Sequence, residues 1–166
     1  MIADMTHPSD QVGRSFYQTL LEVTNVLNSQ RNTEDLWKAI TGHIKKVVSW
    51  ERAGITLYHP DLDAFRFYAV ETSMSIVKLK CDAIIPREGS AMGWVYDHRR
   101  LHIRPQLQQN PVFLEDAFYH EEGLGRMINI PMIIGDNCIG SFNIGSVESG
   151  EPDPENVLFL RQVATQ

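Results

Sequence analysis

Hydrophobic and polar positions alternate most regularly between residues 125 and 150, where two runs rich in Ile, Met and Phe flank the segment Gly135-Asp136-Asn137. This pattern predicts a β-hairpin, because these three residue types tolerate the positive φ angles that tight connections need. Pro131 has no N–H to donate to a ladder. We therefore expect its strand to be a sheet edge there, to bulge, or to turn its nitrogen away from the neighbouring strand.

The length of the connection decides how the two strands pair. With three loop residues, Ile130 pairs with Phe142 and Asn129 pairs with Asn143. One face is then entirely apolar, with Ile128, Ile130, Met132, Phe142 and Ile144. The other face mixes Asn129, Ser141 and Asn143 with Met127, Pro131, Ile133 and Ile139. A two-residue loop would mix polar and apolar residues on both faces, so we predict the three-residue loop and expect helices against the apolar face.

The first half of the chain predicts two helices and then strands. Residues 1–11 lack periodicity and are expected to form a disordered tail, whereas apolar residues from Val12 to Leu27 recur at helical spacing. That apolar stripe is wide enough either for a generously packed core helix or for contact with a partner chain as well. A second helix can be capped by Asn32 or Thr33. Strands are predicted at 53–58 and 65–70, with a weaker one within 76–85.

The second half contains a short helix near Ser90, a brief extended piece at 101–104, and a long polar and aromatic connection over 105–122 with one helical turn at 112–120. Connections of this length are usually functional or mobile. Asp153 and Pro154 suit the cap and first position of a last helix. No stop signal follows before Gln166, so we expect this helix to be truncated and the chain to belong to a longer protein.

Composition restricts the function. The chain has 166 residues, 43% hydrophobic and 22% charged, which suits one globular domain over 12–166. A net charge of −6 argues against direct nucleic-acid binding, which needs clustered Lys and Arg. No apolar run approaches the roughly 20 residues that span a bilayer, and no signal peptide precedes the first helix, so we expect a cytoplasmic protein without membrane contact.

The strongest candidate for a ligand site joins two regions. Free N–H groups at the helix start Gly89-Ser90-Ala91 attract anions, and Trp94 can close such a site as an apolar lid. Equally, Ser90 can simply cap the helix while Trp94 fills core. Polar residues on a covered sheet face cost about 1–3 kcal/mol each when left unpaired, so they should meet water or a ligand. We predict a cavity lined by Ser90, Ala91, Trp94, Asn129, Ser141 and Asn143, with Arg104, Tyr119 and His120 as weaker additions.

The other reactive residues give weaker evidence of a functional site. His98 and His102 have the i, i+4 spacing of metal ligands, but Arg99 and Arg100 lie between them, so solvated histidines are the better interpretation. Cys81 and Cys138 lie far apart, in predicted strand segments. No nucleophile, oxyanion motif or carboxylate pair stands at a recognisable spacing. We therefore predict no enzyme, no metal and no cofactor.

The order of elements resembles a GAF domain. The residues that carry the resemblance are Ile85-Pro86-Arg-Glu-Gly89-Ser-Ala-Met-Gly93-Trp94-Val95, Met127-Ile-Asn-Ile130-Pro131-Met132, Ile139-Gly140-Ser-Phe142, and the helix from Asp153. Residues Phe16 to Thr24 also look like sensor domains that precede sigma-54-dependent activators of the formate-hydrogenlyase type.

The resemblance implies an α+β fold: an antiparallel sheet of five or six strands, with the first, second and last helices on one face. Short helices and loops form a ligand pocket on the other face. It also implies a homodimer through the terminal helices and an output domain in a longer bacterial chain. The chain departs from the bilin-binding, cyclic-nucleotide-binding and methionine-sulfoxide-reducing members, because it lacks their cysteines or their Asn-Lys-Phe-Asp-Glu signature.

Three functions follow from the resemblance. The first is a sensory module for an unidentified small molecule, acting in transcriptional regulation. The second is a ligand-free dimerisation scaffold. The third, weaker, is a cysteine-dependent methionine sulfoxide reductase.

Overall fold

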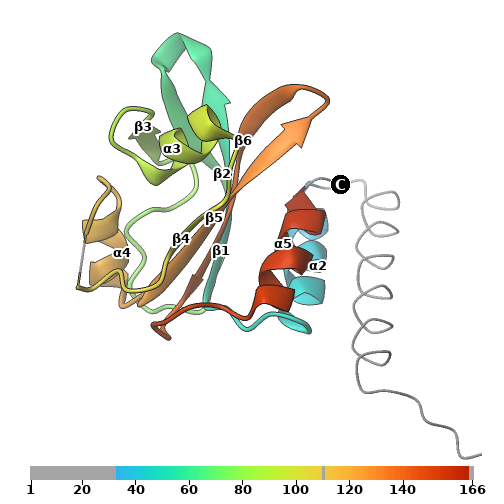
Figure 1. Ribbon diagram of the computed structural model, residues 1–166, viewed down its shortest axis with the longest axis vertical. Helices are drawn as coiled ribbons and strands as arrows, with labels where there is room; N and C mark the ends of the chain where they lie inside the picture. The colour runs from blue at the N-terminus through green and yellow to red at the C-terminus, as the bar shows by residue number, and fades with distance from the viewer. Residues whose placement is uncertain (1–32, 110, 165–166) are drawn as a thin grey trace, which may run out of the picture. The chain divides into compact units, whose positions relative to one another are not determined.

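The alternating segments after Trp50 build a six-stranded antiparallel sheet in the order β3-β2-β1-β6-β5-β4 (Figure 1). The computed structural model describes residues 33–109 and 111–164. The strands are β1 (Arg52–His59), β2 (Ala64–Thr72), β3 (Ile84–Pro86), β4 (His102–Arg104), β5 (Arg126–Ile134) and β6 (Asn137–Ser146). The α+β fold and the number of strands are as predicted.

Helices occupy the predicted regions. They are α2 (Thr33–Lys45), the short helix η1 (Pro60–Leu62), α3 (Ala91–His98), α4 (Asp116–Glu122) and α5 (Pro154–Ala164). The chain divides into two compact units between Val48 and Ser49, so that α2 belongs to the first unit and the sheet to the second. The predicted tail over 1–11 and the predicted helix from Val12 to Leu27 lie outside the described residues. No helix in the described part of the chain is long and apolar enough to cross a membrane.

The hairpin confirms the predicted register but not the predicted loop. Asn129 pairs with Asn143 and Ile130 with Phe142, as expected. Beyond Met132 the pairing shifts by one residue, and the turn consists of Gly135 and Asp136 alone. Gly135 has a φ of 59°, which suits the first central position of a two-residue hairpin turn.

The shift is a β-bulge, and it explains why the loop prediction was wrong. Ile133 lies opposite Cys138 whereas Met132 lies opposite Gly140, so Ile139 is the extra residue on β6. One extra residue compensates for the shorter turn and keeps the apolar and polar faces separate further along the ladder.

The strand proline lies at a local sheet edge. β4 is three residues long and pairs only with Met127, Ile128 and Asn129 of β5. Among the described residues, Pro131 therefore has β6 on one side and no paired strand on the other. This confirms the edge form of the prediction, because a residue without an N–H is tolerated where no ladder bond is needed.

The two faces of the sheet are covered by different elements. Ile130, Phe142 and Ile144 are buried, as predicted, and α5 contacts β5 with Phe159 and Leu160 buried on the helix. Asp153 caps α5 as expected, since its Oδ1 accepts from the N–H of Glu155 at 2.8 Å. Helices α3 and α4 lie on the opposite side of the sheet from α5 (Figure 1). That the first and second helices join α5 stays a prediction.

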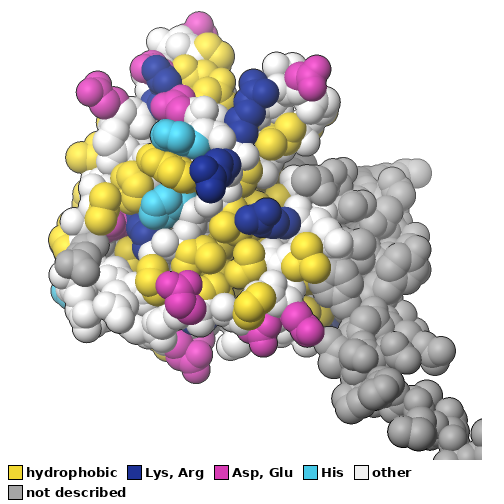
Figure 2. Space-filling view, viewed as in Figure 1, with side chains coloured by type: hydrophobic (Ala, Val, Ile, Leu, Met, Phe, Trp, Pro, Cys, Tyr) yellow, Lys and Arg dark blue, Asp and Glu magenta, His cyan; other side chains and the backbone are white. Residues whose placement is uncertain are grey.

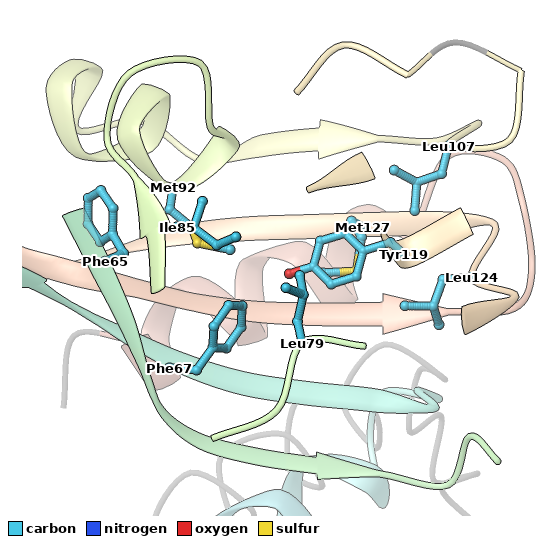
Figure 3. Close-up of a cluster of buried hydrophobic side chains, with 9 residues drawn as sticks. All are labelled: Phe65, Phe67, Leu79, Ile85, Met92, Leu107, Tyr119, Leu124 and Met127. Atoms are coloured by element: carbon cyan, nitrogen blue, oxygen red, sulfur yellow. The ribbon is translucent and has the colours of Figure 1, made fainter. Parts of the chain in front are cut away.

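A hydrophobic cluster fills the space between the sheet and the α3 and α4 side. Figure 3 shows Tyr119 and Met127 near its middle, with Met92, Ile85 and Phe65 toward one end and Leu107 and Leu124 toward the other. The cluster is completed by Phe67 and Leu79. The face that carries Asn129, Ser141 and Asn143 is therefore covered by apolar side chains over much of its area.

The weak strand predicted within 76–85 forms only at its end, as β3. The backbone N–H groups of Lys78 and Leu79 donate to Glu122 Oε1, at 2.7 and 3.0 Å, rather than to a neighbouring strand. Cys81 is consequently exposed in a turn between β2 and β3 and not in a strand, which corrects the prediction. Cys138 does lie in a strand, β6, and is buried.

Candidate functional site

The guanidinium group of Arg104, at the end of β4, is the centre of a buried polar cluster. Its Nη1 donates to Asp116 Oδ1, and its Nη2 donates to Asn129 Oδ1 at 2.7 Å. Glu115 Oε1 lies 4.0 Å from Nη1, and the Tyr119 ring centroid lies 5.8 Å from Cζ. We call these five residues, Arg104, Glu115, Asp116, Tyr119 and Asn129, the Arg104 cluster. Their side chains are at most 5% exposed.

The sequence around α4 explains how the acidic residues reach this position. Asp116 begins the helix, where a carboxylate suits the helix dipole. Its Oδ2 accepts from the backbone N–H groups of Val112 and Phe113, at 2.8 and 3.0 Å, while Oδ1 faces Arg104. One carboxylate therefore both closes a turn of the connection and neutralises the buried guanidinium.

The predicted polar face is satisfied by its own side chains. Asn129 Nδ2 donates to Asn143 Oδ1 at 2.6 Å, and Ser141 Oγ donates to the same oxygen at 2.9 Å. Thr56 Oγ1 and Ser141 Oγ lie 2.7 Å apart. The argument that these groups must meet water or a ligand was therefore wrong, because they meet one another and Arg104.

The predicted anion site at the start of α3 is filled by a carboxylate of the protein. Ser90 caps the helix, with its Oγ accepting from the N–H of Gly93 at 3.0 Å. The N–H of Ala91 donates to Glu115 Oε1 at 2.8 Å. The physical expectation that this helix start attracts an anion holds, but Glu115 supplies the negative charge.

The remaining predicted site residues divide between the cluster and the surface. Trp94 is half-buried and stacks on His98, with ring centroids 4.3 Å apart, while His102 meets its edge at 4.6 Å. Tyr119 is fully buried within the Arg104 cluster, whereas His120 is exposed. Arg104 and Tyr119, predicted as minor additions, are thus central. The cavity predicted between Asn129 and Trp94 stays a prediction.

Burial dominates the electrostatics of this region. It lowers the pKa of Arg104, raises the pKa of Glu115 against the opposing effect of Arg104, and raises the pKa of Tyr119. Burial, together with the positive charge of Arg104, also lowers the pKa of His102. Each shift favours the neutral form of its group, as expected where charges are removed from water.

Several buried polar atoms around Arg104 lack a hydrogen-bond partner within the described residues. They are Arg104 Nε, Glu115 Oε2, Tyr119 Oη and His102 Nδ1. An unpaired buried polar group costs about 1–3 kcal/mol, so a concentration of such groups is unusual for a site that serves packing alone. Together they present a donor, a carboxylate acceptor and two groups that can do either.

A second buried ion pair lies beside the cluster. Arg52 Nη1 donates to Glu122 Oε2 at 3.0 Å, and Arg52 Nη2 donates to the carbonyl of Leu79. The Arg52 guanidinium carbon lies 5.4 Å from the centroid of the Tyr119 ring. Tyr119 therefore contacts two buried guanidinium groups, Arg52 and Arg104.

Sequence reasoning missed Arg52, Glu115, Asp116 and Glu122. The available signal was weak: Arg52 begins a strand with a buried first half, and the three acidic residues lie in the connection that was expected to be functional. Their pairing spans 12 to 70 positions along the chain, so no local pattern reveals it.

Comparison with known proteins gives the family. Residues 30–166 match the GAF domain, while no curated protein matches the chain. Solved structures also share the fold, and three of them are compared with the chain. The GAF domain of a two-component sensor histidine kinase from Bacillus halodurans has a TM-score of 0.71 at 19% identity, covering 81% of this chain and 90% of that one. The GAF domain of a phosphoenolpyruvate-protein phosphotransferase from Coxiella burnetii has a TM-score of 0.77 at 14% identity, covering 91% and 89%.

The third structure corrects the prediction that the chain is not an enzyme. It is the free methionine-R-sulfoxide reductase of Neisseria meningitidis in complex with its substrate, with a TM-score of 0.72 at 15% identity, covering 99% of this chain and 92% of the reductase. An enzyme thus has the same fold over nearly its whole length, so the absence of a recognisable catalytic spacing does not exclude catalysis. At this identity the likeness shows the fold alone, and the match over residues 30–166 gives the classification: the chain belongs to the GAF domain family.

Proposed function

We propose that this GAF domain is a sensory module that binds a small polar molecule at the Arg104 cluster and passes the change to an output domain. The observation that carries the proposal is the set of unpartnered buried atoms, Arg104 Nε, Glu115 Oε2 and Tyr119 Oη. A ligand with both a donor and an acceptor would satisfy them. Mostly apolar surroundings with a few convergent polar groups are typical of small-molecule sites.

The contacts of Asp116 supply a route from ligand to protein. A ligand that also took over Arg104 Nη1 would compete with Asp116, whose other oxygen accepts from the backbone N–H groups of Val112 and Phe113. Ligand binding would therefore change the order of the connection before α4. Asn129 of β5 is a further partner of Arg104, and β5 contacts α5.

The last helix would carry the change to an output domain, for which the resemblance of residues 16–24 favours a sigma-54-dependent transcriptional activator. A homodimer through the first and last helices would couple two copies. The competing proposal, a ligand-free dimerisation scaffold, treats the Arg104 cluster as a purely structural ion pair.

A reductase is supported by a different observation. Cys81 is exposed in a turn, where a thiol can reach a substrate, and the Neisseria meningitidis reductase of this fold was solved with its substrate. Cys138 is a poorer nucleophile, because burial raises the pKa of its thiol. Consumption of free methionine sulfoxide in the presence of a thiol reductant, lost in Cys81→Ser, would establish this activity.

A ligand screen with a matched variant tests the sensory proposal. Thermal unfolding of the chain would be followed with free amino acids, methionine sulfoxide and small carboxylates, and compared with Tyr119→Phe. This substitution removes a hydroxyl that has no partner in the described residues, so the midpoint without ligand should stay the same or rise. The midpoint shift caused by a true ligand should shrink in Tyr119→Phe.

Tyr68→Phe is the control, because Tyr68 is exposed at 53% on β2. A compound that stabilises the wild type and Tyr68→Phe equally, but Tyr119→Phe less, supports a site at the cluster. If every stabilising compound acts equally on all three proteins, the proposed site is wrong and the scaffold function is favoured.

A further inference from the structure

A pocket of about 480 Å³ lies at the sheet edge just before β4 begins, beside the part of β5 that β4 does not pair with, and apart from the Arg104 cluster. Its apolar wall comes from Leu101, Ile130, Pro131 and Ile133. Its charged wall comes from Arg99 and Arg100, which follow α3, and from Arg161 of α5. Figure 2 shows basic side chains next to hydrophobic ones over the region between α3 and α5.

The three arginines of the pocket lack the carboxylate partners that several other arginines of the domain have. Arg52, Arg87 and Arg104 are each paired with carboxylates. Within the described residues, Arg99, Arg100 and Arg161 make no ion pair or side-chain hydrogen bond, and no acidic residue lines the pocket. In a chain of net charge −6, this is a local concentration of positive charge that no carboxylate of the described residues compensates.

The geometry favours a small molecule over an extended peptide. A peptide that paired with the open edge of β5 would need a continuous row of backbone donors and acceptors. Pro131 stands in the middle of that edge and offers no N–H, a usual device against strand addition. The pocket volume also lies within the range of about 300–1,000 Å³ that is usual for small-molecule sites.

We propose that this pocket binds a small organic polyanion, a di- or tricarboxylate or a phosphate ester, with its charged groups on Arg99, Arg100 and Arg161 and its carbon skeleton against Ile130, Pro131 and Ile133. Guanidinium groups bind carboxylate and phosphate oxygens in the same bidentate geometry, so both sources of negative charge fit.

This site differs from the Arg104 cluster in what it joins. Arg99 and Arg100 belong to the connection between α3 and β4, and Arg161 belongs to α5. A ligand that bridges them ties the connection to α5 without passing through the buried cluster. The inference therefore stands independently of the proposed ligand at Arg104.

Calorimetric titration of the chain tests the proposal with two probes, propane-1,2,3-tricarboxylate and inorganic pyrophosphate. We expect saturable one-to-one binding of at least one probe, weakened by added salt because the arginines are exposed. Arg100→Gln and Arg161→Gln should each weaken binding by about tenfold or more, since each removes a hydrogen-bonded charge. Binding of only one probe identifies the favoured oxygen chemistry and supports the site.

Arg66→Gln is the matched control, because it removes the same charge from β2, outside the pocket lining. It should bind the probe within about twofold of the wild type, as expected for a distant charge screened by salt. The proposal is overturned if neither probe binds saturably at millimolar concentration. It is also overturned if Arg66→Gln loses as much affinity as Arg161→Gln, or if the double variant Arg100→Gln/Arg161→Gln binds like the wild type.

Discussion

Glu122 links β1 to the connection between β2 and β3 through buried hydrogen bonds. Its truncation should be among the single changes that destabilise the domain most. Its side chain is fully buried and accepts from Arg52 Nη1 and from the backbone N–H groups of Lys78 and Leu79. Glu122→Ala leaves the Arg52 guanidinium without its counter-ion, which costs about 3–5 kcal/mol. It also leaves the buried N–H of Leu79 unpaired, which adds about 1–3 kcal/mol.

The sum, about 4–8 kcal/mol, is comparable with the whole stability of a typical domain, about 5–15 kcal/mol. Urea unfolding followed by circular dichroism should therefore show Glu122→Ala partly unfolded without denaturant. Glu122→Gln keeps one acceptor oxygen for the backbone and should lose less stability than Glu122→Ala. In the double variant Arg52→Met/Glu122→Ala no buried charge remains, so it should be more stable than Glu122→Ala alone.

Two results would contradict this reasoning. One is a free energy of unfolding for Glu122→Ala within about 1 kcal/mol of the wild type, which would mean that water already reaches the pair. The other concerns the double-mutant cycle of Arg52→Met and Glu122→Ala. If the losses of stability of the two single variants add up to that of the double variant, the Arg52 charge is not what Glu122 compensates.

Other predictions follow from single features. Phe142→Ala should lower the free energy of unfolding in urea by about 3–5 kcal/mol, because Phe142 is buried at 2% exposure, and an unchanged midpoint would refute the register. The pKa of His102 is lowered in the folded state, so urea stability should fall as pH drops through the unfolded value of 6.5 and level off below the folded pKa. His102→Gln should flatten that fall, and an identical pH profile would contradict the assignment. A Cβ at Gly140 would collide with the carbonyl of Thr56, so Gly140→Ala should separate β1 from β6 and lower the thermal midpoint. Gly42→Ala, whose Cβ meets nothing within 4 Å in α2, should instead stabilise by about 0.5–1 kcal/mol, and the same loss in both variants would refute the collision.

The hairpin shows what sequence periodicity can determine. The segregation of Ile130 and Phe142 from Asn129 and Asn143 fixes the register, because a one-residue slip would bury polar and apolar groups together. The bulge at Ile139 leaves no such signal, since Ile is acceptable on either side of the strand. The turn length was therefore wrong although the pairing beyond it was right.

The candidate site shows which residues sequence periodicity cannot predict. Asn129 and Asn143 could be located because they interrupt an apolar strand pattern. Their partner Arg104 was a minor candidate, and Asp116 was missed, because both lie in or beside a connection without periodicity. Glu115 fills the helix start at Ala91 from 24 positions away, a contact that only the folded chain creates.

The shared carboxylate of Asp116 has a consequence for the rate at which any ligand can reach Arg104. The connection before α4 is held by two backbone hydrogen bonds to one oxygen of Asp116, while the other oxygen faces the buried guanidinium. A molecule that replaces Asp116 at Arg104 must wait until this arrangement opens. Association should then become independent of ligand concentration once opening is the slow step, and the opening rate would set how quickly the domain can respond.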